Sequence, residues 1–351
     1  MLKLADKQQQ IIAILLKNSP FSSSQIHLEL EKFGEKTSLI TTKRAVSKLV
    51  EQKILQTSGA GRSVVYTLNI LGRTLADVDA KEYCSIEPDK RYGLKQYNFN
   101  LFSGFPKEIF SKEELVTMKA ATLQYKQRTK NLSATIQKKE LERLVIELSW
   151  KSSKIEGNTY TLLDTEKLLL ENKVAPNKTK EETQMILNHK EAFNFIHKNS
   201  ELFKNIGKKN LEELHKILVK NLNIDISFRK KPVGITGSAY RPLDNFYQIG
   251  EAVEELDEKI SRAKTPYDKS FLALIGLSYI QPFEDGNKRT SRLMANALLL
   301  AHGLAPLSYR SIDEEEYREA LLVFYELNAV KPFKKIFIEQ YIFAANNYLV
   351  K

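Results

Sequence analysis

The sequence predicts a mainly α-helical protein with a small N-terminal module that adds a β-hairpin. From residue 111 onward, amphipathic helical patterns follow one another and strand signals are scarce. The first 75 residues show three helical patterns and then two short β-type runs around glycines. At about 150 residues per domain, 351 residues allow two or three domains. We therefore expect a module at 1–75, an ordered linker at 76–110 and a helical body at 111–351.

The composition excludes several classes of protein. Hydrophobic residues make up 42% of the chain and charged residues 28%, which is ordinary for a folded soluble protein and argues against global disorder. No apolar run approaches the ~18 residues of a membrane span, so no membrane association is expected. No signal-peptide pattern appears at the start, which favours a cytoplasmic location. Because Cys84 is the only cysteine, intrachain disulfides and cysteine-based zinc sites are excluded.

The third helical pattern, near residues 41–55, separates apolar from basic positions. Val46, Leu49 and Val50 form a stripe at i, i+3 and i+4 that is expected to be buried. Four polar residues lie largely off that stripe: Lys43, Arg44, Ser47 and Lys48. The β-type runs at 54–57 and 64–68 flank a glycine-rich turn that carries Arg62, which predicts a hairpin.

Three helices followed by a hairpin resemble a winged helix-turn-helix domain. The resemblance implies that the third helix enters the major groove of duplex DNA and that the hairpin contacts phosphate. Lys43, Arg44, Ser47, Lys48 and Arg62 would then face DNA. Residues 1–70 carry ten Lys and Arg against five Asp and Glu, a weak indication of a polyanionic partner. The alternative is a winged helix that makes protein contacts or a dimer, and the sequence leaves the oligomeric state open, a homodimer included.

The body begins with a Ser-x-x-Glu capping box at Ser111 and Glu114. Helices are expected near 112–128, 134–155, 164–172, 179–198, 209–220, 247–262, 266–280, 288–302, 313–328 and 333–349. The best strand signal is the glycine-punctuated segment 232–242, which predicts a β-hairpin flap. The five histidines (His27, His189, His197, His215 and His302) are expected to be structural.

Residues 278–303 carry the clearest chemical pattern. A helix runs to Ile280, an irregular turn follows, and a second helix begins near Lys288. The first N–H groups of a helix lack partners within it, and the helix dipole adds about half a positive charge there. Gly286 allows these groups to converge on an anion, and Lys288, Arg289 and Arg292 add three cations. With Asp285 as a carboxylate for Mg²⁺, the pattern predicts a site for a nucleoside di- or triphosphate with magnesium.

The run from Gln281 to Arg292, QPFEDGNKRTSR, resembles the motif of the Fic (Fic/Doc) family, His-Pro-Phe-x-Asp/Glu-Gly-Asn-Gly-Arg-x-x-Arg. The resemblance implies transfer of AMP from ATP to a Ser, Thr or Tyr hydroxyl of a target protein. It also implies a role for each matching position. Phe283 would anchor the loop, Asp285 would hold Mg²⁺, Gly286 and Asn287 would cradle phosphates, and Arg289 and Arg292 would bind the β- and γ-phosphates.

Two positions depart from the family motif. Gln281 stands where the family has the histidine that accepts the target's proton, and an amide cannot do so near neutral pH. Lys288 stands where glycine is usual, and lysine there is found in the phosphate-transferring Doc branch. Three interpretations remain open: a weakened adenylyltransferase with Gln281, Asn287 and Arg289 at the catalytic positions, a Doc-like phosphotransferase, or an inactive nucleotide-sensing DNA-binding regulator.

Two further segments resemble parts of the same family. Ser152, Glu156 and Gly157 match its inhibitory pattern at the end of a helix expected over 134–157, which implies that Glu156 pairs with Arg292 and fills the γ-phosphate position. The flap resembles the family's target-binding hairpin, with the candidate edge at Ile235, Thr236, Gly237 and Ser238.

Overall fold

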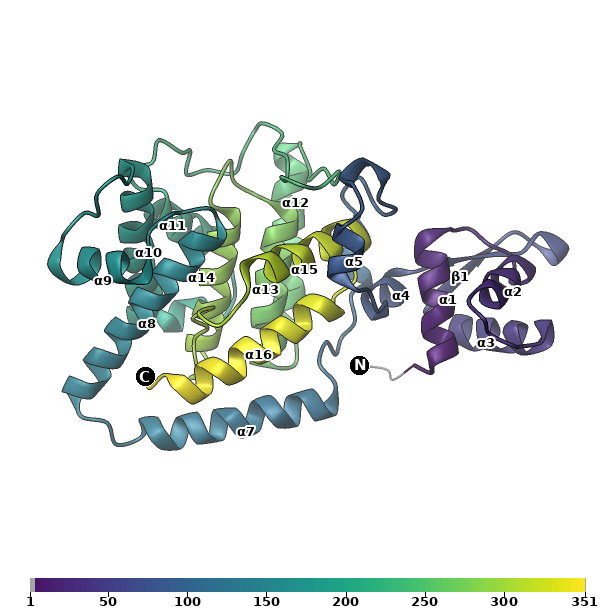
Figure 1. Ribbon diagram of the computed structural model, residues 1–351, viewed down its shortest axis with the longest axis horizontal. Coiled ribbons are helices and arrows are strands. Elements are labelled where there is room, and N and C mark those ends of the chain that lie inside the picture. The colour runs from purple at the N-terminus through teal and green to yellow at the C-terminus, as the bar shows by residue number, and fades with distance from the viewer. Residues whose placement is uncertain (1–3, 351) are drawn as a thin grey trace. The chain divides into compact units, whose positions relative to one another are not determined.

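The computed structural model describes residues 4–350 and confirms a mainly helical protein (Figure 1). The chain divides into two compact units. The first comprises Met1–Ile109, Gly234–Arg241 and Arg318–Lys335, and the second comprises Phe110–Val233, Pro242–Tyr317 and Ile336–Lys351. Two helices have residues in both units: α15 (Glu314–Leu327) and α16 (Lys331–Asn347).

The first unit contains the predicted helices and hairpin of the N-terminal module. Its elements are α1 (Asp6–Lys17), α2 (Ser23–Lys32), α3 (Leu39–Glu51), β1 (Leu55–Ser58), β2 (Val65–Leu68), α4 (Ile70–Leu75), α5 (Ala80–Cys84) and α6 (Leu101–Gly104). Strands β1 and β2 pair antiparallel, from Leu55 opposite Leu68 to Ser58 opposite Val65. Ser38 caps α3, so this helix begins before residue 41, where the predicted pattern starts.

The core of this unit extends beyond the N-terminal module. Ile11 of α1, Leu49 of α3 and Leu68 of β2 pack in the same apolar cluster as Tyr83 and Leu327. Tyr83 also donates a hydrogen bond from its hydroxyl to Glu326 Oε2 at 2.6 Å. The linker residues around Tyr83 are therefore part of a folded core.

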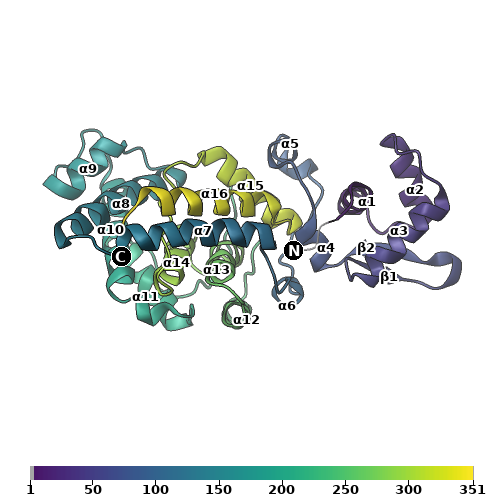
Figure 2. The ribbon, with the colours of Figure 1, turned by 90° about the horizontal axis from the view of Figure 1, so that it is seen from below.

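The second unit is helical. Its elements are α7 (Lys112–Thr129), α8 (Ala134–Ile155), α9 (Leu162–Glu171), α10 (Lys180–Lys198), α11 (Lys208–Leu218), α12 (Phe246–Ser261), α13 (Pro266–Ile280) and α14 (Asn287–Leu300), with parts of α15 and α16. Figures 1 and 2 show α7 beside α16, where Thr122 Oγ1 lies 2.6 Å from the hydroxyl of Tyr341. Helices α13 and α14 form a buried helical hairpin whose Ser278 and Ser291 hydroxyls are 2.8 Å apart.

The flap differs from the prediction. Residues 232–242 form a loop with one turn, and the only sheet among residues 4–350 is β1–β2. The carbonyl of Gly237 accepts a hydrogen bond from Arg91 Nη1 at 2.9 Å, and the Ser238 hydroxyl donates to Glu326 Oε1 at 2.6 Å. Side chains satisfy these groups, Tyr240 is buried, and the one β-type contact of the segment among the residues described is an isolated parallel bridge between Arg241 and Gln96.

Within the described residues, no helix combines the length and the apolar character needed to cross a membrane.

Candidate nucleotide site

The loop between α13 and α14 is fixed by its own side chains. Phe283 is fully buried and stacks on His215, with ring centroids 3.6 Å apart. Asn287 bonds both backbone groups of Phe283, accepting from its N–H and donating to its carbonyl, each at 2.8 Å. The predicted anchoring role of Phe283 fits this burial. The Asn287 amide closes the loop, so its side chain is used within the protein.

Gly286 caps the start of α14 in a conformation that favours glycine. Its φ is +76°, and a Cβ there would lie 3.3 Å from His215 Cε1 and 3.5 Å from Arg289 Nη2. The loop therefore turns tightly into α14 and leaves the first N–H groups of that helix directed outward, as an anion site requires.

Two buried arginines follow on the first turns of α14. Arg289 is 2% exposed and Arg292 is fully buried. Among residues 4–350, the buried Nη1 atom of each arginine has no hydrogen-bond partner. Buried donors of this kind are costly unless something accepts from them. Because both belong to cations, an anionic oxygen is the acceptor that their chemistry fits best.

The end of α8 supplies one anion to the α13–α14 corner, which is the loop between these helices and the first turns of α14. Arg292 donates from Nη2 to Glu156 Oε1 at 2.8 Å and from Nε to the Ser152 hydroxyl at 2.8 Å. Lys288 Nζ lies 3.6 Å from Glu156 Oε2. Gly157 follows with φ +94°, which ends the helix and directs Glu156 toward α14. The structure thus brings Ser152, Glu156, Lys288 and Arg292 together.

The charges of this group are stable near neutral pH. Burial acts to raise the pKa of Glu156, but Arg292 and Lys288 outweigh it and hold that pKa below its ordinary value. Burial acts to lower the pKa of Arg292, but Glu156 and Tyr317 raise it by more, so the net shift is upward. Burial also lowers the pKa of Arg289, opposed by Asp285 and Glu156. Glu156 is therefore a carboxylate that occupies an arginine pocket, as a phosphate would.

Asp285 is the one candidate for a magnesium ligand that the sequence predicted. Its side chain is 65% exposed and lies 3.3 Å from Arg289 Nη2. Among the described residues there is no group of three or more His, Cys, Asp or Glu side chains that could hold a metal ion. One carboxylate suffices for Mg²⁺ when phosphate oxygens supply further ligands, so Asp285 fits that role only together with a bound nucleotide.

Gln281 ends α13 in a left-handed conformation, with φ 52° and ψ 60°. Its side-chain amide donates from Nε2 to the carbonyl of Ser278 at 2.6 Å, so the amide turns back onto its own helix. No hydrogen bond to a histidine is present at Gln281 among the described residues. The position therefore offers no group that accepts a proton near neutral pH.

Two residues outside the motif support the α13–α14 loop. Arg229 is buried and donates to the carbonyl of Gln281 at 2.7 Å, to that of Lys231 at 2.9 Å and to that of Leu243. His215 lies under Phe283, with Nδ1 3.3 Å from the Thr290 hydroxyl. The buried position of His215 fits its expected structural role. The contacts of Arg229 could not be predicted, because they join residues far apart in the sequence.

The buried histidines predict a dependence of stability on pH. Burial lowers the pKa of His215 to about 4, and burial beside Arg292 and Arg289 lowers that of His189 as well. Since an unfolded histidine titrates near ~6.5, the unfolded chain takes up the proton first as the pH falls. The stabilisation is complete above pH ~6.5 and is lost progressively toward pH ~4, by on the order of 3 kcal/mol for His215.

Urea unfolding of the wild type and of His215→Gln between pH ~4 and ~7 measures this effect. The slope of unfolding free energy against pH should be smaller in the variant, by the amount that corresponds to about one bound proton. The contribution of His189 should be retained. Equal slopes in the two proteins would contradict the prediction.

The other predicted residues lie in the first unit. Lys43, Arg44, Ser47 and Lys48 are exposed on α3, whereas Val46 and Leu49 are buried. Arg62 is exposed in the turn between β1 and β2. At the candidate flap edge, Ile235 is buried and its carbonyl accepts from the N–H of Ser238, so Ile235, Thr236, Gly237 and Ser238 form a turn.

Residues 205–299 match the model of the Fic/DOC family. The chain contains a Fic domain. The matched range covers the α13–α14 corner, including Gln281, Asp285, Arg289 and Arg292.

Distant relatives of this Fic domain are described as protein adenylyltransferases. "Protein adenylyltransferase fic-1" of Caenorhabditis briggsae is 26% identical over 184 residues, which cover 51% of this chain and 36% of the relative. "Protein adenylyltransferase Fic" of Nematostella vectensis is 28% identical over 190 residues, covering 52% of this chain and 44% of the relative. The match thus spans less than half of these relatives.

Solved structures share the fold. Fic-1 from C. elegans has a TM-score of 0.59 at 19% identity and covers 68% of this chain and 72% of its own. A Fic domain-containing signalling protein from Bacteroides thetaiotaomicron has a TM-score of 0.57 at 20% identity and covers 66% and 94%. At this level of identity the likeness concerns the fold, and it agrees with the Fic domain.

Proposed function

We propose that this protein is a Fic-type protein adenylyltransferase that is self-inhibited by Glu156 and has low intrinsic activity because of Gln281. The reaction is the transfer of AMP from ATP to a Ser, Thr or Tyr hydroxyl of a target protein. The observation that carries the proposal is the pair of buried arginines at the start of α14, whose Nη1 donors have no partner in the described part of the chain.

The arginines support binding of a polyphosphate. Arg289 and Arg292 offer donors to phosphate oxygens, and the start of α14 adds the first N–H groups, which have no partner within the helix. Mg²⁺ held at Asp285 would neutralise part of the phosphate charge. Lys288, 31% exposed, lies beside the same pocket and can reach a terminal phosphate once Glu156 has left.

Glu156 supports self-inhibition because it competes for the same donors. Its carboxylate takes one of Arg292's two terminal nitrogens and lies near Lys288. A γ-phosphate and this carboxylate carry like charge, and both cannot occupy one cationic pocket without repulsion. Nucleotide binding in the reactive arrangement therefore requires Glu156 to withdraw.

Labelled ATP tests the proposed reaction. Transfer of AMP marks protein only when the α-phosphate is labelled, whereas the Doc-like alternative raised by Lys288 marks protein only when the γ-phosphate is labelled. A lysate supplies the unknown target. Marking from γ-labelled ATP alone would replace the adenylyltransferase proposal by a phosphotransferase.

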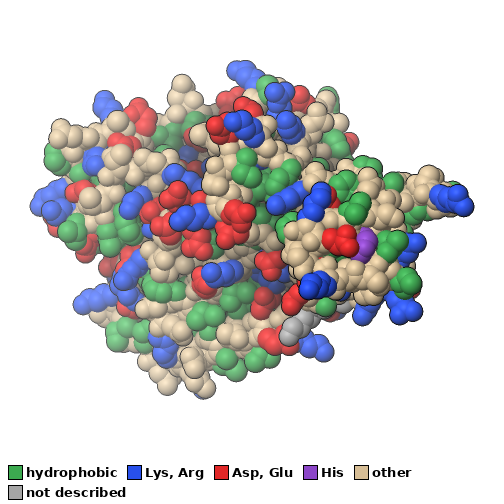
Figure 3. Space-filling model, turned by 45° about the vertical axis from the view of Figure 1, so that its right-hand side comes forward, with side chains coloured by type: hydrophobic (Ala, Val, Ile, Leu, Met, Phe, Trp, Pro, Cys, Tyr) green, Lys and Arg blue, Asp and Glu red, His purple; other side chains and the backbone are tan. Residues whose placement is uncertain are grey.

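A second candidate function, binding of duplex DNA by the N-terminal module, is favoured by the exposed face of α3. Lys43, Arg44, Ser47 and Lys48 all lie exposed on this helix, and Arg62 lies at the tip of the β1–β2 hairpin. Figure 3 shows that Lys and Arg side chains elsewhere on the displayed face are interspersed with acidic ones. The exposed face of α3 thus presents three cations, Lys43, Arg44 and Lys48, and Glu51 is the one acidic residue of this helix.

Arg44→Ala should weaken binding to duplex DNA and lower the slope of log affinity against log salt by about 0.9, the value for one lost phosphate contact. Fluorescence anisotropy with a labelled duplex at several salt concentrations measures both quantities. Lys81→Ala, an exposed substitution on α5, is the control and should change neither. Identical slopes for wild type and Arg44→Ala would contradict DNA binding through α3.

A further inference from the structure

Helix α8 makes ionic contacts on two different faces. One face carries Ser152 and leads to Glu156, which contact Arg292. Another face carries Glu147, Lys151 and Lys154, spaced at i, i+4 and i+7, and these contact the segment 310–314. The second set of contacts has no part in nucleotide binding as described above.

The contacts of this second face are mostly buried. The Lys151 side chain is 7% exposed and bonds Glu314 Oε1. Glu147, 9% exposed, accepts from Arg310 Nη1 at 3.0 Å and from the hydroxyl of Tyr348. Lys154 also lies near Glu314, at 3.5 Å, but is 45% exposed. A buried charge is kept only when it is paired, so these residues hold α8 against the 310–314 segment.

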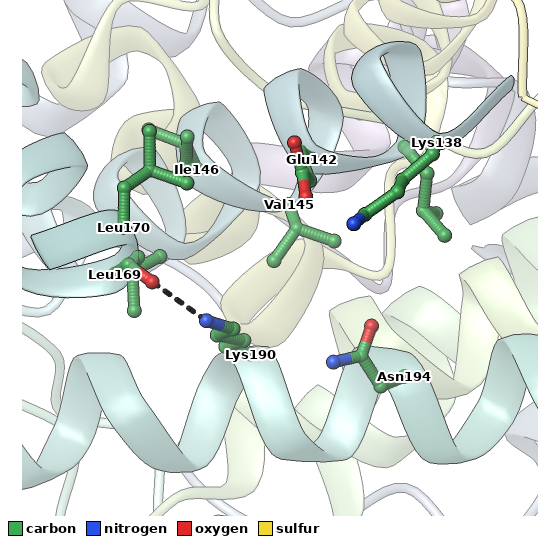
Figure 4. Close-up of a pocket in the computed structure, with 9 residues that line it drawn as sticks. Lys138, Glu142, Val145, Ile146, Leu169, Leu170, Lys190 and Asn194 are labelled. Carbon is green, nitrogen blue, oxygen red and sulfur yellow. Dashed lines mark hydrogen bonds between the residues drawn. The ribbon is translucent and has the colours of Figure 1, made fainter. Parts of the chain in front are cut away.

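Helix α8 also packs against α9 and α10, where Val145, Ile146 and Leu169 are buried. A cavity of about 340 Å³ lies there, and the α8 residues Lys138, Glu142, Val145 and Ile146 line it together with Lys190 of α10 (Figure 4). Lys190 donates across it to the carbonyl of Leu169 at 2.7 Å. Helix α8 is therefore held both by packing on this side and by the ionic contacts with 310–314.

The first turn of helix α15 contacts both α8 and Arg292. Glu314, at its first residue, bonds Lys151, and Tyr317, one turn later, lies under the Arg292 guanidinium with its ring centroid 5.7 Å away. The same turn of α15 therefore contacts both the inhibitory helix and the arginine that Glu156 occupies.

We propose that Lys151 and Glu147 are positioning residues for inhibition: by holding α8 on the 310–314 segment, they keep Glu156 seated on Arg292. The inference rests on the proposed self-inhibition. It adds that residues outside the nucleotide site set how strongly Glu156 inhibits. Loss of the Lys151–Glu314 pair lets α8 shift, so Glu156 leaves Arg292 more often and ATP competes more successfully.

The test is calorimetric titration of ATP with Mg²⁺ into the full chain. Lys151→Met should tighten ATP binding by about fivefold, at the low end of coupling between sites. It should have no further effect in the Glu156→Gly background, because the coupling acts only through Glu156. Lys154→Met is the matched control, since it removes an exposed lysine next to the same partner and should leave affinity unchanged within about twofold.

Each result separates the inference from the proposed function. Should Glu156→Gly fail to tighten ATP binding, the self-inhibition itself is wrong. If Glu156→Gly does tighten ATP binding, two results overturn the positioning role. One is an affinity for ATP in Lys151→Met equal to that of the wild type. The other is a gain in affinity from Lys151→Met that is the same in the Glu156→Gly background as in the wild-type background. If Lys151→Met does not fold, Glu314→Gln removes the same ion pair. The Glu314 side chain is 26% exposed and that of Lys151 is 7% exposed, so this change is milder, and the same outcomes apply.

Discussion

Glu156→Gly is expected to tighten binding of ATP with Mg²⁺ by about tenfold or more, within the usual range of coupling between competing groups. The substitution frees Arg292 Nη2 and removes the carboxylate that lies near Lys288. Both cations then face the nucleotide instead of an internal anion. Isothermal titration calorimetry on wild type and variant measures the change, which should diminish at high salt.

Glu171→Gly provides a matched control for this variant. Glu171 also ends a helix, α9, but is exposed and pairs with the nearby Lys173. Its replacement should leave the affinity for ATP unchanged. If both variants bind ATP as the wild type does, Glu156 does not restrict the site.

Gln281→His in the Glu156→Gly background is expected to raise AMP transfer by about 10²–10⁴-fold, the usual contribution of a general base. The amide of Gln281 now bonds the carbonyl of Ser278, and a histidine at this position would place a titratable ring at the end of α13. Histidine also tolerates the left-handed backbone found there better than most residues. Incorporation from α-labelled ATP into protein is the readout.

Gln281→Ala in the same background separates base chemistry from loop geometry. It removes the amide without supplying a base, so incorporation should stay at the low level of Glu156→Gly alone. No label from α-labelled ATP in the histidine variant, despite ATP binding, would show that more than the missing base prevents transfer.

Much of the fold follows from local patterns that the sequence displays. The stripe of Val46 and Leu49 is buried in α3, and Ser111 with Glu114 forms the capping box that begins α7. Helix α13 ends at Ile280, as the pattern predicts. These features depend on residues within one or two turns of each other, so periodicity and capping chemistry are enough to predict them.

The errors come from contacts between distant residues. The segment 232–242 has the glycines of a hairpin, yet Arg91 and Glu326 satisfy its turn instead of a second strand. Arg229 is unremarkable in the sequence but is buried against Gln281. Sequence pattern identifies the cations of the α13–α14 corner, and the resemblance implies the pair of Glu156 with Arg292 that the structure contains. The contact of Tyr317 with Arg292, in contrast, emerges only when the chain is folded.

The two hydrogen bonds between the Asn287 amide and the Phe283 backbone affect the thermodynamics of ligand binding. Both polar groups of the amide are already used, and the aromatic ring beneath them is stacked on His215. A loop held in this way is preorganised, so a nucleotide need not order it and loses little conformational entropy there. The free and occupied proteins should therefore have the same backbone at this corner, and the motion that accompanies binding should be confined to the end of α8.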